Sequence, residues 1–243
     1  SFSTISEDDT NNTGRSVSTF SNQDSVSDDE NYLADGVRGV AVTSVDNANG
    51  AWQYSVNNRS SWVAFGSVSA SSARLLDGSN SQHHIRFIPT ADYFGSSSLT
   101  YRAWDKTTGT AGGTADASSY GGTTAFSQGE VTRSITITSK NDEPTASFQT
   151  PPAVNEDVGT QTIANFATPA NGATQLEGSQ TFSYSVSRAS GSSTSLFSVQ
   201  PAISANGTLT YTPKANANGA VTFNVTVIDN GGTSNSGDDR RTY

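Results

Sequence analysis

Two stretches decide the fold: Ile85-Arg-Phe-Ile-Pro-Thr-Ala-Asp-Tyr-Phe-Gly95 and Leu209-Thr-Tyr-Thr-Pro-Lys-Ala-Asn-Ala-Asn-Gly219. In each, a proline follows an aromatic residue by two positions and precedes a glycine by six and an aspartate, Asp105 or Asp229, by sixteen. Large and polar residues alternate before the proline, which is the period-two pattern of a half-buried β-strand. A spacing shared by two distant segments indicates an internal repeat.

A second pair of similar segments lies upstream of the two stretches. Ile5-Ser6-Glu7-Asp8 corresponds to Val154-Asn155-Glu156-Asp157, and Asn141-Asp142-Glu143-Pro144 lies between the two copies. Proline favours an extended and stiff joint at this point. The sequence therefore predicts two related domains in tandem, residues 1–142 and residues 143–243.

Short alternating segments recur along the chain, separated by clusters of Gly, Asn, Asp and Ser. We expect strands at residues 52–56, 85–87, 99–104, 131–137, 182–186, 209–211 and 221–228. No window of helical length carries an apolar stripe of period 3.6. The pattern predicts an all-β fold of two tandem antiparallel β-sandwiches.

The composition excludes several classes of protein. Apolar residues make up 33% of the 243, but the 3 Trp, 8 Tyr and 11 Phe can nucleate a core, so the chain is not of the disordered type. A net charge of -9 without a basic cluster disfavours nucleic acid and favours cations. With no Cys, disulfides and thiolate metal sites are excluded, and no apolar run reaches the length of a membrane span.

These segments resemble the cadherin-like, Ig-like tandem repeats of very large bacterial cell-surface adhesins. The resemblance covers nearly the whole chain, including Trp52-Gln53-Tyr54-Ser55, Arg102-Ala103-Trp104-Asp105 and Asp229-Asn230-Gly231-Gly232-Thr233. It implies sandwiches strung end to end on the outside of the cell, with a role in adhesion or as a spacer. Its partners would be neighbouring repeats, identical subunits, or a glycan or other surface ligand.

The resemblance also implies calcium at the joint between domains. Ca²⁺ takes six to eight oxygen ligands, mostly carboxylates and carbonyls. The residues that match the family's ligands at the central joint are Glu7, Asp28, Asp105, Asn141 and Asp142, with Glu156 and Asp229 as weaker candidates at the end of the second domain. The alternative is that these side chains are solvated loop residues.

Other residues with chemical potential have simpler explanations. His83 and His84 are adjacent before a strand, so their side chains point to opposite faces and a surface loop is favoured over a metal site. Five aromatic residues could form a sugar-stacking platform, although alternation favours a core position for several: Trp52, Tyr54, Trp62, Phe65 and Trp104.

The sequence offers no activated nucleophile, phosphate loop or dinucleotide fingerprint, so we expect no enzyme. The favoured interpretation is an extracellular structural or adhesive repeat module, stiffened by calcium. The alternative from another class is a carbohydrate-binding module.

The two domains differ at their last strand. The first runs through Arg133-Ser-Ile-Thr-Ile-Thr138, whereas the second reaches Arg240-Arg241-Thr242-Tyr243, where the corresponding strand begins. We expect the second sandwich to be one strand short and to expose an unpaired edge beside an apolar groove. Either the chain is a fragment, or Ser1-Phe2-Ser3-Thr4-Ile5 of a neighbouring copy supplies the strand and builds a filament.

Overall fold

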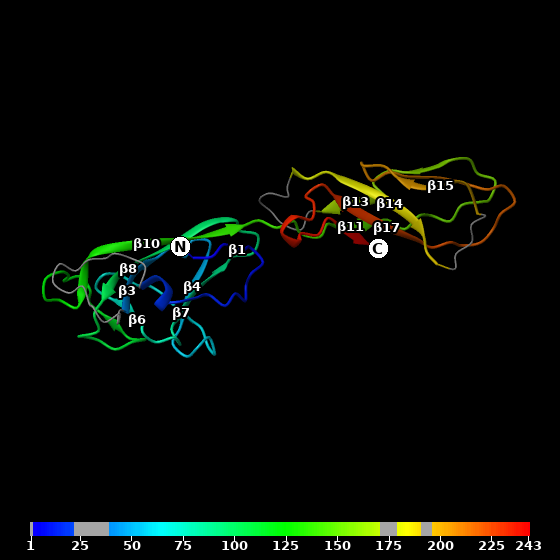
Figure 1. Ribbon diagram of the computed structural model, residues 1–243. Coiled ribbons are helices and arrows are strands. Elements are labelled where there is room, and N and C mark those ends of the chain that lie inside the picture. Colours follow the sequence, from blue (N-terminus) through cyan, green and yellow to red (C-terminus); the bar gives the residue numbers. More distant parts are fainter. Residues whose placement is uncertain (1, 22–38, 171–178, 191–195) are drawn as a thin grey trace. The chain divides into compact units, whose positions relative to one another are not determined.

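The computed structural model describes residues 2–21, 39–170, 179–190 and 196–243 (Figure 1). The chain divides into two compact units, unit 1 (Ser1–Ser139) and unit 2 (Lys140–Tyr243). The sequence places the domain boundary between Asp142 and Glu143. Apart from the short helix α1 (Ser18–Ser21) and a 3-10 turn (Ser234–Ser236), the regular elements of the described residues are strands.

The described residues of unit 1 form two sheets. The larger has six strands in the order β1 (Ile5–Ser6), β10 (Phe126–Thr138), β8 (Gly95–Trp104), β3 (Gly39–Val45), β6 (Ala73–Asp77) and β9 (Thr114–Ala115). The smaller has four, in the order β2 (Arg15–Ser16), β7 (His84–Pro89), β4 (Gly50–Ser55) and β5 (Val63–Ala64). The neighbouring strands are antiparallel, except that β1 runs parallel to β10.

The core of unit 1 is built on Trp52. Alternation along β4 turns Trp52 and Tyr54 inward, opposite Phe87 and Ile85 of β7. The indole ring lies 5.2 Å from the Phe87 ring, and its Nε1 donates a 2.8 Å hydrogen bond to Ser97 Oγ on the other sheet. Because the polar edge of the buried indole has a partner, the two sheets can close without an unsatisfied donor.

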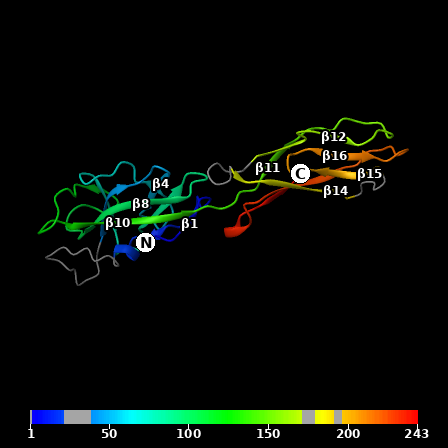
Figure 2. The ribbon, with the colours of Figure 1, turned by 90° about the horizontal axis from the view of Figure 1, so that it is seen from above.

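In unit 2, the residues that the structure describes form three small sheets, and Figure 2 shows β12, β16 and β15 side by side. The sheets are β11 (Thr145–Phe148) with β13 (Ala167–Ala170); β12 (Gln161–Ile163), β16 (Leu209–Pro213) and β15 (Phe197–Ile203); and β14 (Phe182–Arg188), β17 (Phe223–Asp229) and β18 (Arg240–Thr242). Strands therefore form at all seven of the segments expected from alternation. The predicted all-β class and β-sandwich fold are confirmed.

The core side chains of unit 2 are less completely buried than those of unit 1. Its main cluster of buried side chains comprises Phe166, Ala167, Ile203, Leu209 and Tyr211. Each of these retains between 3% and 8% of its accessible surface, whereas Trp52, Ile85 and Phe87 of unit 1 retain none. Unit 2 therefore has the smaller hydrophobic contribution to stability.

The first residues of the chain belong to unit 1. Ile5 pairs with Ile137 in the parallel β1–β10 ladder, and the ring of Phe2 lies 5.0 Å from that of Trp52. Residues 2–5 of the segment that the sequence suggests as a donated strand are thus engaged within their own unit. To donate it, unit 1 would have to give up these contacts.

Candidate functional site

The structure does not bring Glu7 and Asp105 together. Glu7 follows β1 and donates its backbone N–H to Thr138 O, at the end of the sheet where β8 begins with Gly95. Asp105 follows Trp104 at the other end of β8, and its backbone N–H donates to Ala125 O. Ten residues of extended strand separate the two ends, a span of about 30 Å. The two carboxylates therefore cannot ligate one ion in this fold.

The carboxylate of Asp105 has a local structural role. Its Oδ1 accepts hydrogen bonds from the backbone N–H of Thr107 at 2.8 Å and from the Thr107 hydroxyl at 2.7 Å. This arrangement closes the loop after β8 as an Asx turn. Asp28, the acidic-turn candidate, lies outside the described residues.

Asn141 is held tightly inside unit 2. Its Nδ2 donates to Asp229 Oδ1 at 3.0 Å and to Asp238 O at 2.8 Å, and its Oδ1 accepts from Gln180 Nε2 at 2.6 Å. A Cβ added at Gly231 would overlap the Asn141 side chain, so glycine is required there. We call Asn141, Gln180, Asp229, Gly231 and Asp238 the Asn141 clasp. Sequence reasoning identified Asn141 and Asp229 as special but assigned them to calcium.

The donor set fits calcium poorly within either unit. Asp229 is 6% exposed and its Oδ2 is buried without a hydrogen-bond partner, which is the one feature that suits a cation. The side-chain amide of Asn141, however, already makes three hydrogen bonds within unit 2, two donated by Nδ2 and one accepted by Oδ1. Glu156 lies along a groove that also contains Phe223, the first residue of β17, whereas Asp229 is the last residue of that strand. Among the described residues, no three His, Cys, Asp or Glu side chains gather as a metal site.

The expectation of a surface loop at His83 and His84 is wrong, because both side chains are buried, at 3% and 6% exposed. His83 Nδ1 accepts a 3.0 Å hydrogen bond from the backbone N–H of Asp77. That bond requires a neutral imidazole with its proton on Nε2. Burial lowers the pKa of His83 below its ordinary value, and the nearby Asp77 carboxylate opposes this only in part.

We expect His83 to make unit 1 sensitive to acid. The folded-state pKa lies below the unfolded value of about 6.5, so the unfolded chain takes up the proton first. The stability is therefore present at neutral pH and is lost as the pH falls below about 6.5 toward the folded pKa. Urea unfolding of unit 1 between pH 7 and pH 5 measures the loss, which His83→Asn should reduce because Asn keeps the acceptor without titrating. Equal pH slopes for both proteins would contradict this role of His83.

The aromatic residues form cores rather than a sugar-stacking platform. Trp52, Tyr54, Phe65 and Trp104 are all at most 6% exposed. The ring of Trp62 is partly exposed, and the Arg86 guanidinium lies 4.2 Å from its centroid. Cation–π stacking of this kind covers one face of the indole ring.

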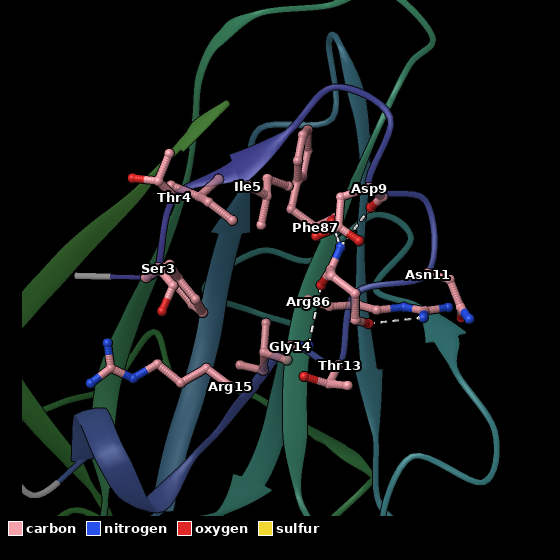
Figure 3. Close-up of a pocket in the computed structure, with 14 residues that line it drawn as sticks. Ser3, Thr4, Ile5, Asp9, Asn11, Thr13, Gly14, Arg15, Arg86 and Phe87 are labelled. Atoms are coloured by element: carbon pink, nitrogen blue, oxygen red, sulfur yellow. Dashed lines mark hydrogen bonds between the residues drawn. The ribbon is translucent and has the colours of Figure 1, made fainter. Parts of the chain in front are cut away.

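A pocket of about 390 Å³ lies between residues 2–15 and β7 (Figure 3). Its polar groups hold the N-terminal segment in place. Asn12 Nδ2 donates to Phe87 O at 2.8 Å, and Arg86 Nη1 donates to Asn12 O at 3.3 Å. Arg86 Nε also donates to Gln53 Oε1 at 2.9 Å. These hydrogen bonds attach residues 9–15 to the smaller, four-stranded sheet of unit 1.

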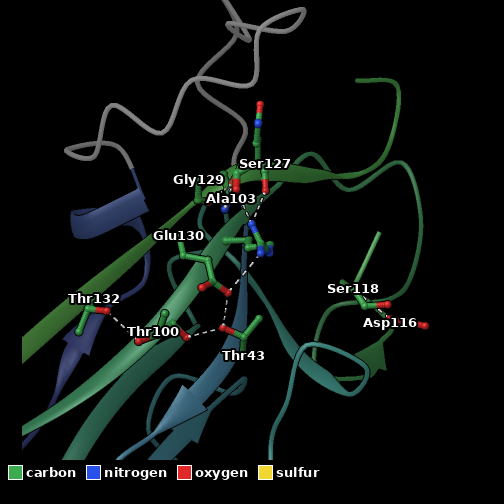
Figure 4. A network of polar contacts seen from close by, with 11 residues as sticks. Thr43, Thr100, Ala103, Asp116, Ser118, Ser127, Gly129, Glu130 and Thr132 are labelled. Atoms are coloured by element: carbon green, nitrogen blue, oxygen red, sulfur yellow. Dashed lines mark hydrogen bonds and ion pairs between the residues drawn. The ribbon is translucent and has the colours of Figure 1, made fainter. Parts of the chain in front are cut away.

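A buried arginine that the sequence did not single out holds the β-bulge of β10 (Figure 4). Arg102 is 7% exposed, and its Nη1 donates to Ser127 O at 3.0 Å and to Gln128 O at 2.6 Å. Its Nη2 lies 3.4 Å from Glu130 Oε1, which also accepts from the Thr43 hydroxyl. These bonds satisfy carbonyls that the bulge removes from the strand ladder.

Residues 141–238 match the family model described as Bacterial Ig domain. The match lies within unit 2 and agrees with its sandwich fold. It supports a bacterial Ig-like repeat, without pointing to cadherin-like adhesins in particular. No curated protein and no solved structure matches the chain significantly. Within the part of the chain that the structure describes, no helix has the length and apolar character to cross a membrane.

Proposed function

We propose that this chain is a non-enzymatic structural repeat module of an extracellular bacterial surface protein, in which its sandwiches act as spacers that carry load between an adhesive part and the cell. The observation that carries the proposal is the match of residues 141–238 to the bacterial Ig domain family. The site geometry agrees with it, since Asn141, Arg102 and His83 all bind backbone or side chains of the fold.

Unit 1 is connected in a way that suits a mechanical role. Its first strand, β1, is parallel to its last, β10, with Ile5 opposite Ile137 and Ser6 opposite Thr138. A force on the two ends of the unit pulls these strands in opposite directions along their common axis. The backbone hydrogen bonds between them are then loaded together rather than one after another.

Unit 2 lacks this arrangement among its described residues. Its last strand, β18, is antiparallel to β17 and pairs with it at three positions, opposite Thr226, Val227 and Ile228. The larger buried core of unit 1 adds to the difference. We therefore expect unit 1 to resist force better than unit 2.

Force spectroscopy on the chain, attached at both ends, tests this expectation. We predict two separate all-or-none unfolding events, with extensions of about 360 Å for unit 2 and then about 480 Å for unit 1 at the higher force. Deleting residues 1–6 should lower the unit 1 force toward that of unit 2. A control variant, Val63→Ala on the exposed strand β5, should leave both forces unchanged.

Two results would contradict the proposal. One is extension of both units without resolvable force peaks, since a spacer must stay folded under load. The other is polysaccharide binding that is lost in Trp62→Ala, which would favour a carbohydrate-binding module.

A further inference from the structure

The larger sheet of unit 1 carries a second apolar cluster on the face that points away from the core around Trp52. Neighbouring residues of a strand point to opposite faces, so on β6 Leu76 belongs to the main core and Leu75 to the second cluster. Residues 105–125, which connect β8 to β10, cover this face, and we call them the covering loop. We call the second cluster the Trp104 cluster, and its buried members are Ala41, Ala73, Leu75, Trp104, Ala117, Ala125 and Phe126.

The covering loop is fastened along β6 by backbone hydrogen bonds. The Leu75 N–H donates to Gly113 O at 3.0 Å, and Leu75 O accepts from the Gly112 N–H at 2.8 Å. The loop then pairs with β6 through β9, and the Ala117 N–H donates to Ala70 O at 2.7 Å. One strand therefore holds most of the length of the loop.

The covering loop contributes few apolar side chains of its own. Its buried apolar residues are two alanines, Ala117 and Ala125. A methyl group buries little area, so the hydrophobic effect gives this loop less stability than it gives the strands beneath. The closed position of the loop therefore depends on its hydrogen bonds and on the way its first residues are held.

Lys106 holds the first turn of the covering loop. Its Nζ donates to both carboxylate oxygens of Asp77, at 3.1 and 3.2 Å, and to Ser79 Oγ at 2.9 Å. Lys106 also has a φ of 69°, in the left-handed region that is unfavourable for a residue with a side chain. The contacts of the ammonium group offset the cost of this backbone conformation.

Asp77 is held in turn by His83. The Asp77 N–H donates to His83 Nδ1 at 3.0 Å, and His83 is buried. An imidazolium ring carries a proton on both nitrogens and accepts no hydrogen bond. Protonation of His83 therefore breaks the bond to the Asp77 backbone and places a positive charge beside the carboxylate that Lys106 binds.

We propose that His83, Asp77 and Lys106 form an acid-sensitive latch, which holds the covering loop closed at neutral pH and releases it when His83 takes up a proton, while the main core of unit 1 stays folded. The imidazolium would attract the Asp77 carboxylate and repel the Lys106 ammonium group. The loop would then lose its attachment where it leaves β8. This latch adds a response to acid to the proposed structural role.

The direction of the pH dependence follows from the groups that act on His83. They are Asp77 of β6, His84 of β7 and Lys106 of the covering loop. Burial lowers the pKa of His83 most; Asp77 raises it, and His84 and Lys106 lower it. The open form, in which His83 has an ordinary pKa of about 6.5, therefore takes up the proton first. The closed form is stable at neutral pH and loses stability as the pH falls below about 6.5.

Hydrogen exchange of the full chain, followed by NMR at pH 7 and at pH 5, tests the latch. We expect the amides of Leu75 and Gly112 to have protection factors at least about tenfold below those of the β8–β10 ladder, because the loop opens without the core. Between pH 7 and pH 5 the factors of Leu75 and Gly112 should fall several-fold. The limit is about 25-fold, which is what one imidazole with a pKa of 6.5 in the open form can produce.

Two histidine variants show which imidazole is responsible. His83→Asn keeps an acceptor for the Asp77 N–H without titrating, so it should remove the fall between pH 7 and pH 5. His84→Asn is the matched control, because His84 is also buried but its Nδ1 lies 3.2 Å from Gln82 O and is already the donor of that bond. This variant should keep the fall.

Lys106→Gln tests the other end of the latch and decides alone if His83→Asn fails to fold. It removes the charge that binds Asp77, so the protection factors of Leu75 and Gly112 should be several-fold lower already at pH 7. Four results would overturn the proposal: equal protection of the loop and the β8–β10 ladder, no change between pH 7 and pH 5, an undiminished change in His83→Asn, or no effect of Lys106→Gln.

Discussion

Trp52→Ala should unfold unit 1 under conditions in which unit 2 stays folded. The indole is fully buried and contacts the rings of Phe2 and Phe87. Removing so large a buried side chain costs about 3–5 kcal/mol, a large share of the stability of a domain this size. The substitution also leaves Ser97 Oγ without the indole N–H that it accepts.

The measurement is calorimetry of the full chain, in which each unit gives its own transition. We expect the unit 1 transition to fall by more than about 10 °C while the unit 2 transition keeps its position. Trp62→Ala is the matched control, because Trp62 is partly exposed and belongs to none of the buried clusters. Equal effects of the two substitutions would show that Trp52 is not the centre of the core.

Alternation along a strand is a local property, which is why the strands could be predicted from the sequence. In β4, Trp52 and Tyr54 alternate with polar residues, and this alone places them inward. The same reasoning failed for Arg102 and for His83, whose burial depends on the bulge in β10 and on the loop after β6. The carbonyls that Arg102 binds lie 25 and 26 positions away in the sequence. The partner of His83 is only 6 positions away but lies across a loop, and alternation along a strand says nothing about either.

The candidate calcium site shows a related limit. Glu7 and Asp105 each follow a strand, so both could be placed at an end of the sandwich from sequence. The end of the sandwich at which each carboxylate lies depends on two things: the β1–β10 ladder, which pairs Ile5 with Ile137, and the direction of β8. Pairing of strands across more than a hundred residues decides this, and the resemblance on which the ligand set rests does not contain it.

Asn141 is the residue at which the two interpretations predict opposite results. As a calcium ligand it should tolerate replacement by aspartate, because a carboxylate is a stronger ligand for Ca²⁺ than an amide. As the centre of the clasp it should not. Its Nδ2 donates to Asp229 Oδ1 at 3.0 Å, and Asp229 is buried. Asn141→Asp would therefore place a second carboxylate next to the buried carboxylate of Asp229.

We expect Asn141→Asp to destabilise unit 2 by about 3 kcal/mol at pH 7, because the Asp229 carboxylate loses a hydrogen-bond donor and gains a like charge. Calorimetry with 5 mM CaCl₂ and with chelator separates the outcomes, because 5 mM is about fifty times the Kd of about 10⁻⁴ M at the tight end of the range for extracellular calcium modules. Asn141→Ala is the control, since it removes the donor without adding charge and should cost less. If calcium restores the melting temperature of Asn141→Asp and raises that of the unaltered chain, the clasp is a calcium site. If Asn141→Asp lowers the melting temperature equally with chelator and with calcium, the role of Asn141 is to attach the first residues of unit 2 to the rest of that unit.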